Sequence, residues 1–373
     1  MTETPVTHFS EIQSYGWSDA LQRQFEPYAA RGLVPGRVIV QQRGLYRLAT
    51  DLGDLAAELS GRFVHEAEET GFPVAGDWVA CAARPGEGAA TIQAVLPRAS
   101  LFVRRTAGPG APVGQAVAAN VDLALLVASL NAELNPRRVE RYLATAWESG
   151  AQPLVVLTKA DACPDLAASL AQIEAVAIGV EVHAVSAVTG QGLSALAEHL
   201  APGRTAVLLG SSGVGKSTLV NALAGAALMA VGEIRLDDAK GRHTTTHREL
   251  VRLPSGALVL DTPGMRALGL WDAESGLERV FGDVAREIET LAAGCRYRDC
   301  AHHGEPGCAV AQAVADGRLD ADRWRSWTKL QRELAHLERR EDPVAQATHR
   351  KHWIGISKAH RAEQRRRRRE EDG

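Results

Sequence analysis

The sequence lacks any apolar run near the roughly 20 residues of a membrane span, and its first residues lack the basic and apolar regions of a signal peptide. We therefore expect a cytoplasmic protein that does not enter a membrane. A strong net charge is also missing: 42 Lys and Arg stand against 45 Asp and Glu, a balance of −3. This excludes a basic nucleic-acid coat. The 373 residues leave room for two to three domains.

Cysteine is scarce, and its placement is uneven. Cys81 and Cys163 are isolated in the sequence, and we expect them to be ordinary small buried residues. Cys295, Cys300 and Cys308 instead lie close together with His302. In a reducing compartment such a group favours a metal over a disulfide. Cys₃His is a common tetrahedral zinc set, and four ligands leave no open position, so we predict a structural zinc. Ligation by the adjacent His303, or reduced cysteines with no metal, stay open as alternatives.

The first hundred residues predict a small barrel behind an extension. Residues 1–32 are a poorly patterned extension whose aromatic residues suggest that it packs on the rest. Residues 33–98 contain short strands between turn residues, which favour an OB-fold barrel. Such barrels often bind nucleic acid, but a purely structural barrel is an alternative. The expected strands are Arg37–Val40, Leu45–Ala49, Gly61–Val64, Asp77–Ala80 and Thr91–Leu96. Residues 99–112 read as a linker.

The middle of the chain, residues 113–275, alternates buried strands with helices, which predicts an α/β domain with a mostly parallel sheet. Residues 276–345 follow as a mostly helical zinc-binding module. Residues 346–373 form a basic tail, in which nine Lys or Arg stand against four Asp or Glu from His349 onwards. Such a tail is solvated and can also hold RNA phosphates.

A glycine-rich stretch at the centre of the α/β domain predicts a phosphate-binding P-loop. It follows the apolar run 206–209 and precedes the helical run 219–223, so that backbone N–H groups and a helix N-terminus can face phosphate oxygens. Lys216 can reach the β- and γ-phosphates, and Ser217 can ligate Mg²⁺. The predicted nucleotide-binding residues are Gly210, Ser211, Ser212, Gly213, Val214, Gly215, Lys216, Ser217 and Thr218.

Residues at the carboxyl ends of neighbouring strands predict the rest of the site. Asp261, after strand 258–260, is expected to hold Mg²⁺ through water, and the N–H of Gly264 to approach the γ-phosphate. Thr245, with Thr246 as the alternative, is expected to ligate Mg²⁺ from the switch I loop. His243 in the same loop is a candidate for orienting the attacking water, although a loop histidine is more often merely solvated.

Two further loops predict guanine as the base. Asp161 follows strand 153–157, and its carboxylate can accept two hydrogen bonds from the N–H edge of guanine, which adenine does not offer. Lys159 can lie along the base. Thr158-Lys159-x-Asp161 resembles the Asn-Lys-x-Asp motif of GTPases, with Thr158 in place of Asn. Ser186-Ala187 resembles the Ser-Ala motif whose N–H supports the guanine oxygen.

These base-reading motifs precede the P-loop, whereas ordinary GTPases place them after it. The sequence therefore resembles a circularly permuted GTPase, and the second phosphate-sensing segment, 261–264, leads into the zinc module. Met265 stands where many GTPases have a water-orienting Gln. We therefore expect slow intrinsic hydrolysis of GTP and a partner that completes the catalytic site.

The barrel, the permuted motifs, Met265 and the Cys₃His group together resemble the bacterial ribosome small-subunit-dependent GTPases of the RsgA or YjeQ type. The stretches Pro73–Val79, Leu96–Arg98, Ala119–Asp122, Gly241–Thr246 and Asp261–Met265 carry the resemblance, which covers roughly residues 33–340. It implies a GTPase that binds the small (30S) ribosomal subunit and its rRNA, assists late maturation of that subunit and is stimulated by it. We expect a monomer. A P-loop ATPase or kinase, and a GTP switch acting on proteins without RNA, are the alternatives.

Overall fold

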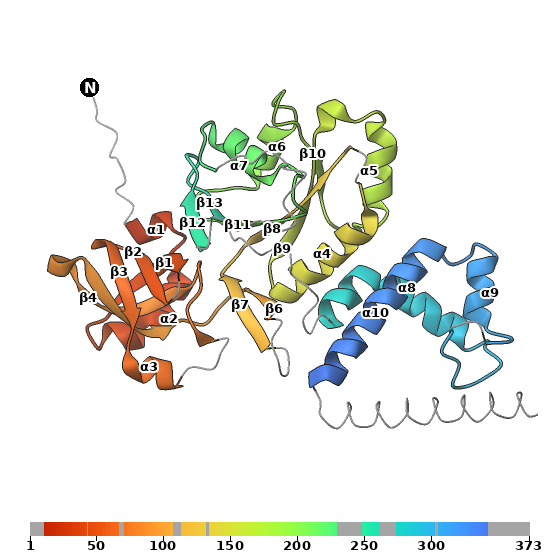
Figure 1. The fold of residues 1–373 in the computed structure, drawn as a ribbon, viewed down its shortest axis with the longest axis horizontal. Coiled ribbons are helices and arrows are strands. Elements are labelled where there is room, and N and C mark those ends of the chain that lie inside the picture. The colour runs from red at the N-terminus through yellow and green to blue at the C-terminus, as the bar shows by residue number, and fades with distance from the viewer. Residues whose placement is uncertain are drawn as a thin grey trace, which may run out of the picture.

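The computed structural model describes residues 11–42, 44–66, 71–106, 113–131, 134–229, 248–261, 274–302 and 305–341. Figure 1 shows three parts in sequence: a barrel at the N-terminal end, a central sheet flanked by helices, and a helical C-terminal module. Within these residues, no helix combines the length and the apolar character that a membrane crossing requires. The predicted order of barrel, α/β domain and helical module is confirmed.

The N-terminal part is a closed five-stranded barrel with the strand order β1-β2-β3-β5-β4 and a further pairing of β1 with β4. β3 and β5 are parallel and the other neighbours antiparallel, and helix α3 (Gly61–Glu66) follows β3. This is the connectivity of an OB fold. The strands are β1 Val34–Gln42, β2 Leu45–Thr50, β3 Gly53–Leu59, β4 Trp78–Arg84 and β5 Ala89–Val95.

One predicted strand of the barrel was wrong. Residues 61–64 are helical, and the third strand is Gly53–Leu59. Leu55 and Ala57 are buried while Ala56 and Glu58, which alternate with them, are exposed, the period-two pattern of a strand with one face on a core. Asp, Ala, Glu and Gly have low strand propensity, so burial of this face outweighs the local preference.

The N-terminal extension packs on the barrel. Helices α1 (Glu11–Ser14) and α2 (Asp19–Ala29) bring Ile12 and Phe25 into one core cluster with Trp78. The Trp17 ring meets that of Trp78 edge to face, with centroids 4.9 Å apart. The aromatic residues of the extension are therefore part of the fold.

A two-stranded ribbon occupies much of the expected linker. β6 (Leu101–Thr106) pairs antiparallel with β7 (Val113–Ala119), so residues 101–106 are a strand and not a flexible connection. Phe102 is fully buried in the core that also contains Val139 and Leu143. Burial of this aromatic residue against the α/β domain explains why the segment is ordered.

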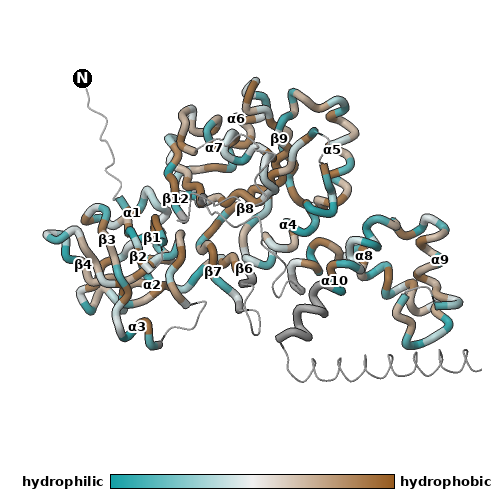
Figure 2. Tube along the Cα trace, in the orientation of Figure 1, coloured by the Kyte–Doolittle hydropathy of each residue, from teal (hydrophilic) through white to brown (hydrophobic). Residues whose placement is uncertain are grey.

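The central domain has the sheet order β10-β9-β8-β11-β13-β12, in which only the β12–β13 pair is antiparallel. Leu123, Leu125 and Val127 of β8 face one core cluster, whereas Ala124 and Leu126 face the other. Figure 2 shows the resulting hydrophobic centre at β8 and β9. The strands are β8 Leu123–Ser129, β9 Gln152–Thr158, β10 Val182–Ala184, β11 Thr205–Leu209, β12 Arg248–Arg252 and β13 Leu258–Asp261; the helices are α4 Pro136–Ser149, α5 Leu166–Glu174, α6 Leu193–Glu198 and α7 Lys216–Ala224.

Barrel and central domain form one continuous structure. β1 pairs with β12 through Val40–Glu249 and Gln41–Arg248, which joins the two sheets.

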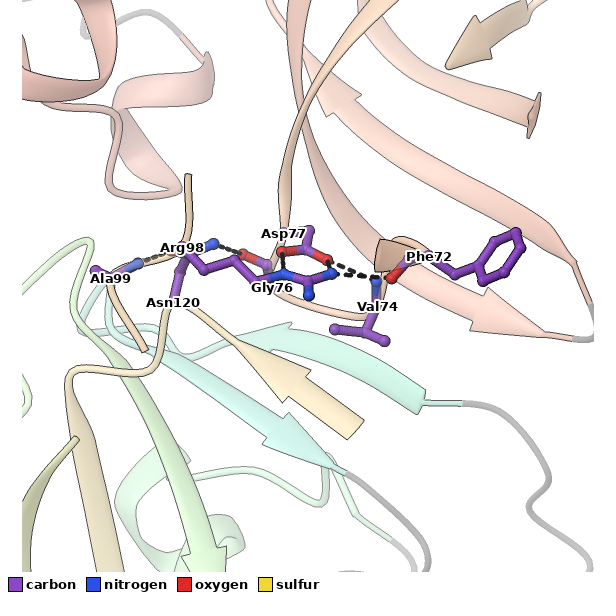
Figure 3. Close-up of polar contacts among 7 residues, drawn as sticks. All are labelled: Phe72, Val74, Gly76, Asp77, Arg98, Ala99 and Asn120. Atoms are coloured by element: carbon purple, nitrogen blue, oxygen red, sulfur yellow. Dashed lines mark hydrogen bonds and ion pairs between the residues drawn. The ribbon is translucent and has the colours of Figure 1, made fainter. Parts of the chain in front are cut away.

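Beside this ladder, Arg98 donates from Nε and Nη2 to the two carboxylate oxygens of Asp77, at 2.8 and 2.7 Å. Asn120 donates from Nδ2 to the carbonyl of Gly76 at 3.1 Å, and Figure 3 shows these contacts in one row. A Cβ on Gly76, whose φ is 92°, would lie 2.2 Å from the carbonyl oxygen of Ala119, so this close approach requires glycine.

The C-terminal module consists of α8 (Glu274–Ala292), α9 (Ala309–Ala315) and α10 (Ala321–Glu341). α8 packs on α4 of the central domain, where Leu277 and Phe281 join Val139 and Leu143 in one core cluster. The helices approach closely: a Cβ on Gly276 would lie 2.2 Å from the Ala144 carbonyl oxygen. The module is thus attached to the helix that follows β8.

Candidate nucleotide and metal sites

The predicted P-loop connects β11 to α7 at the carboxyl edge of the sheet. Gly213 and Gly215 have φ values of 79° and 94°, which favour glycine. Lys216, the first residue of α7, donates from Nζ to the carbonyl oxygens of Gly210 at 2.8 Å and Ser211 at 2.6 Å. Its ammonium group therefore lies over the loop, next to exposed Ser212 and Gly213. Backbone N–H groups, a helix N-terminus and one cation in this arrangement can bind phosphate oxygens.

The residues of the Thr-Lys-x-Asp stretch hold the P-loop from the adjacent strand end. Thr158 Oγ1 is buried, 2.6 Å from the carbonyl oxygen of Val214 and 3.2 Å from that of Ala128, and can donate to either. Lys159 has a left-handed backbone, with φ 61°, and donates from Nζ to the Gly213 carbonyl at 3.3 Å. Thr158 and Lys159, which were predicted to contact the base, thus bond to the main chain of the P-loop in this structure.

The two predicted base-reading loops lie against each other. Asp161 is exposed on the single 3₁₀ turn Ala160–Ala162, and Ala160 donates its N–H to the carbonyl of Val185 at 3.1 Å. Buried Ser186 accepts hydrogen bonds at Oγ from the N–H groups of Val188 and Thr189, at 3.2 and 3.1 Å. Its side chain therefore shapes the loop 186–189, and the bond from Ala160 to Val185 joins the starts of the two loops.

One contact of the P-loop was missed from the sequence. Arg138, near the start of α4, donates from Nη1 to Ser211 Oγ at 2.7 Å. Asn135 caps this helix by accepting the Arg138 N–H, which fixes where the helix begins. The position of Arg138 in the sequence could have indicated this contact. Arg138 lies near the start of a helix that follows a parallel strand, and such a helix begins at the edge of the sheet where ligands bind. Ser211 therefore contacts two cations, Lys216 at its carbonyl and Arg138 at its hydroxyl.

Part of the predicted site lies outside the described residues. Asp261 ends β13, and its backbone pairs with Glu249 of β12, next to the P-loop strand β11. Ser217 and Thr218 lie in the first turn of α7. The switch residues His243, Thr245, Thr246, Gly264 and Met265 are not among the residues that the structure describes.

The four predicted zinc ligands converge between α8 and α9, and their ligand atoms all lie within 4.8 Å of one another. Nδ1 of His302 lies 3.6 Å from Sγ of Cys295 and 3.5 Å from Sγ of Cys308, and these two sulfurs are 4.0 Å apart. Tetrahedral zinc with bonds of about 2.3 Å to sulfur and 2.0 Å to nitrogen places sulfur atoms about 3.8 Å apart and sulfur about 3.5 Å from nitrogen. The separations fit a four-coordinate metal centre.

The acid–base chemistry of the cluster also suits a cation. Burial raises the pKa of Cys295, but hydrogen bonds from the main-chain N–H groups of Ala309 and Val310 and from the neighbouring thiols bring the pKa below its usual value. Burial and the neighbouring Cys295 raise the pKa of Cys300 to about 11. A thiolate at Cys295 therefore disfavours a second thiolate at Cys300. A divalent cation removes this repulsion because it stabilises each thiolate.

A parallel α/β sheet with a P-loop at its centre, whose base-reading loops come earlier in the chain, defines a circularly permuted P-loop GTPase. Comparisons with known proteins agree: residues 95–271 match the family model RsgA GTPase, and residues 205–344 match the model 50S ribosome-binding GTPase. The chain belongs to the RsgA GTPase family and is a GTP hydrolase.

The similarity to curated relatives extends over nearly the whole chain. The protein named small ribosomal subunit biogenesis GTPase RsgA from Opitutus terrae is 45% identical over 95% of this chain and 98% of its own length. The protein of the same name from Streptomyces coelicolor is 47% identical over 95% of both chains. Among solved structures, YjeQ from Thermotoga maritima matches with a TM-score of 0.56 and 25% identity, over 81% of this chain and 99% of that one. YloQ, titled a circularly permuted GTPase, matches with a TM-score of 0.52 and 25% identity, over 82% of this chain and 96% of that one.

Proposed function

We propose that this chain binds GTP with Mg²⁺ and hydrolyses it to GDP and phosphate while bound to the small ribosomal subunit, late in the maturation of that subunit. The observation that carries the proposal is the alignment with relatives named for small-subunit biogenesis, which spans 95% of the chain at 45 and 47% identity. The nucleotide half of the proposal is supported independently by the geometry of the P-loop and its neighbours.

The phosphates bind in the loop 210–218. When the nucleotide binds, the Lys216 ammonium group exchanges its two carbonyl acceptors for oxygens of the β- and γ-phosphates. The positive end of the α7 dipole also attracts the phosphates. The residues that would hold Mg²⁺ are Ser217, Asp261 and Thr245 of switch I. When bound, the ion would supply positive charge against the negative charge that develops during phosphoryl transfer.

Guanine binds between the two loops at the ends of β9 and β10. The exposed carboxylate of Asp161 accepts from the N1–H and N2–H₂ groups of the base, Lys159 lies along it, and the main chain at Ser186 and Ala187 supports the guanine oxygen. Thr158 connects base and phosphate sites, because its hydroxyl reaches the Val214 carbonyl at 2.6 Å. A threonine here keeps the bond to the P-loop without the amide of asparagine.

Hydrolysis depends on the switch residues. His243 orients the attacking water, and the Gly264 N–H contacts the γ-phosphate. Met265 has no group for positioning water, so intrinsic hydrolysis is slow and the ribosomal subunit completes the site.

The parts that would contact the ribosome are attached next to the nucleotide loops. α4 contacts the P-loop through Arg138 and the C-terminal module through the neighbouring Arg137, which lies 3.0 Å from Asp322 of α10. β12, the strand after the switch I segment, pairs with β1 of the barrel. A change in the nucleotide can therefore reach barrel and module through packed elements, besides the covalent path from Asp261 into α8.

We assign rRNA binding to the barrel (33–98), the zinc-stabilised module (276–345) and the basic tail (346–373) of a cytoplasmic monomer with no membrane association. The zinc is structural: Cys295, Cys300, His302 and Cys308 hold the loop between α8 and α9. The GTPase domain spans 113–275, the segment 99–112 joins it to the barrel, and residues 1–32 belong with the barrel.

A large-subunit partner is the second candidate, because residues 205–344 match the model named 50S ribosome-binding GTPase. That match covers only residues 205–344, whereas the relatives named for the small subunit match 95% of the chain. A protein partner without RNA is the third candidate, and the same experiment distinguishes all three.

The test is co-sedimentation of the chain with purified 30S subunits, 50S subunits and 70S ribosomes, each with a non-hydrolysable GTP analogue or with GDP. We expect binding to 30S subunits that is stronger with the analogue than with GDP. Preferential binding to 50S subunits would favour the second candidate, and the absence of nucleotide-dependent binding to any particle would favour a protein partner.

A further inference from the structure

A second group of metal-ligating side chains lies at the outer edge of the central sheet, on elements separate from the Cys₃His module (Figure 1). Glu181 directly precedes β10, His183 lies within β10, and His199 is the C-cap residue that follows α6. Oε2 of Glu181 lies 3.5 Å from Nε2 of His183 and 3.4 Å from Nε2 of His199. The three ligand atoms all lie within 4.8 Å of one another.

The fold fixes the backbone of each of these residues. Glu181 and His183 are two residues apart in an extended segment and so share one face. The Glu181 carbonyl accepts the N–H of Val155 at 3.0 Å, and His183 is in register with Val156 of β9. The His199 carbonyl accepts a hydrogen bond from Nη1 of Arg204 at 3.2 Å. Ligands held in this way lose little conformational entropy when they bind an ion.

The two imidazole rings leave a nitrogen that needs a partner. They meet edge to face, with centroids 4.9 Å apart and an interplanar angle of 74°, and both present Nε2 to the same carboxylate oxygen. Nε2 of His183 is buried, and among the described residues it makes no hydrogen bond: it approaches the Glu181 oxygen only to 3.5 Å. A buried polar nitrogen without a partner is unfavourable, and coordination of a cation satisfies it.

We propose that Glu181, His183 and His199 form a second metal site, which binds a divalent transition-metal ion of the zinc class through two imidazole nitrogens and one carboxylate oxygen. Tetrahedral bonds of about 2.1 Å put nitrogen and oxygen ligands about 3.4 Å apart, close to the two separations seen here. Imidazole with carboxylate suits Zn²⁺, Ni²⁺ and Cu²⁺ better than Mg²⁺ or Ca²⁺. The Glu181 side chain is 64% exposed, so the ion can enter from solvent and complete its coordination with water.

The site spans a segment that matters for the nucleotide. His183 and His199 lie on either side of residues 184–198, which include Ser186, Ala187 and α6. A bound ion therefore joins the two ends of this segment and holds α6 against β10. Metal binding itself does not rest on the proposed function and can be measured without nucleotide.

The test is a calorimetric titration of the full chain with Ni²⁺ at pH 7.5, with the Cys₃His zinc loaded beforehand and measured by elemental analysis. We expect His183→Gln and His199→Gln each to lose one equivalent of bound Ni²⁺ relative to the parent, or to weaken that equivalent at least tenfold. Glu181→Gln, a change at an exposed side chain, should weaken the same equivalent. His65→Gln, at an exposed histidine of α3, is the matched control and should bind as the parent does.

Zinc content and melting temperature without added Ni²⁺ should stay the same in all variants, which shows that they fold. Equal Ni²⁺ stoichiometry and affinity in the parent, His183→Gln and His199→Gln would overturn the proposal and leave the group as two polar contacts to the Glu181 carboxylate. Loss of Ni²⁺ binding in His65→Gln alone would overturn it too.

Discussion

The buried ion pair between Asp77 and Arg98 is expected to be a large single contributor to the stability of the barrel and its junction with the GTPase domain. The Asp77 side chain has no exposed surface, and the Arg98 side chain is 14% exposed. Asp77 accepts three hydrogen bonds, two from Arg98 and one from the Val74 N–H at 2.8 Å, while Arg98 also donates to the Phe72 carbonyl at 2.9 Å. Burial raises the pKa of Asp77, and the bonds from Arg98 and Val74 act against this shift.

Asp77→Asn should destabilise the protein by about 3–5 kcal/mol, because it leaves the Arg98 charge buried without its counter-ion. An asparagine amide group also turns one acceptor into a donor, and it would face the N–H groups of Arg98 or Val74 (Figure 3). A loss of this size lowers the melting temperature by about 10 °C in a domain of 150–250 residues. Differential scanning calorimetry and urea unfolding followed by Trp fluorescence measure the change.

The matched control is Arg47→Gln, which breaks the ion pair of Arg47 with Glu249 across the same junction. Those side chains are 49% and 36% exposed and 3.3 Å apart, so the loss should stay below about 1 kcal/mol. The double variant Asp77→Leu/Arg98→Met removes both charges and should recover much of the stability that Asp77→Asn loses. If Asp77→Asn costs no more than Arg47→Gln, the importance given to burial here is wrong.

Three further predictions concern the sites. Thr158→Val, which removes the hydroxyl 2.6 Å from the Val214 carbonyl, should speed GDP dissociation about tenfold, whereas Thr158→Ser should keep the parent rate; stopped-flow release of a fluorescent GDP analogue decides this. Asp161→Asn should weaken GDP binding at least tenfold and favour xanthosine diphosphate, and unchanged preference in competition binding would contradict the guanine assignment. Cys300→Ser should lower the zinc content from one to near zero per chain and unfold the C-terminal module, with Cys163→Ser as the control that keeps its zinc.

The parts of the site that could be predicted from the sequence are those set by local chemistry. The P-loop is a contiguous turn between a strand and a helix, and the four predicted zinc ligands lie within fourteen residues, so spacing alone brings each group together. The circular permutation could also be predicted, because it is a matter of motif order, and the sheet order confirms it.

What could not be predicted depends on contacts between distant residues or on burial that outweighs local preference. Strand β3 consists largely of poor strand formers, and β6 lies in a stretch with turn residues next to it; each is stabilised by a partner strand. Arg138 lies 73 residues before Ser211, and no local pattern indicates that they touch. The pairing of Asp77 with Arg98 likewise appears only when the barrel closes.

The central claim is that GTP hydrolysis by this chain depends on the small ribosomal subunit. Its most direct measurement is the rate of phosphate release from GTP by the full chain, alone, with 30S subunits and with 50S subunits at equal concentration, together with Lys216→Ala as the inactive control. We predict slow release by the chain alone, at least tenfold stimulation by 30S subunits, little by 50S subunits and none with Lys216→Ala. A rate that 30S subunits leave unchanged, or that Lys216→Ala retains, would contradict the account.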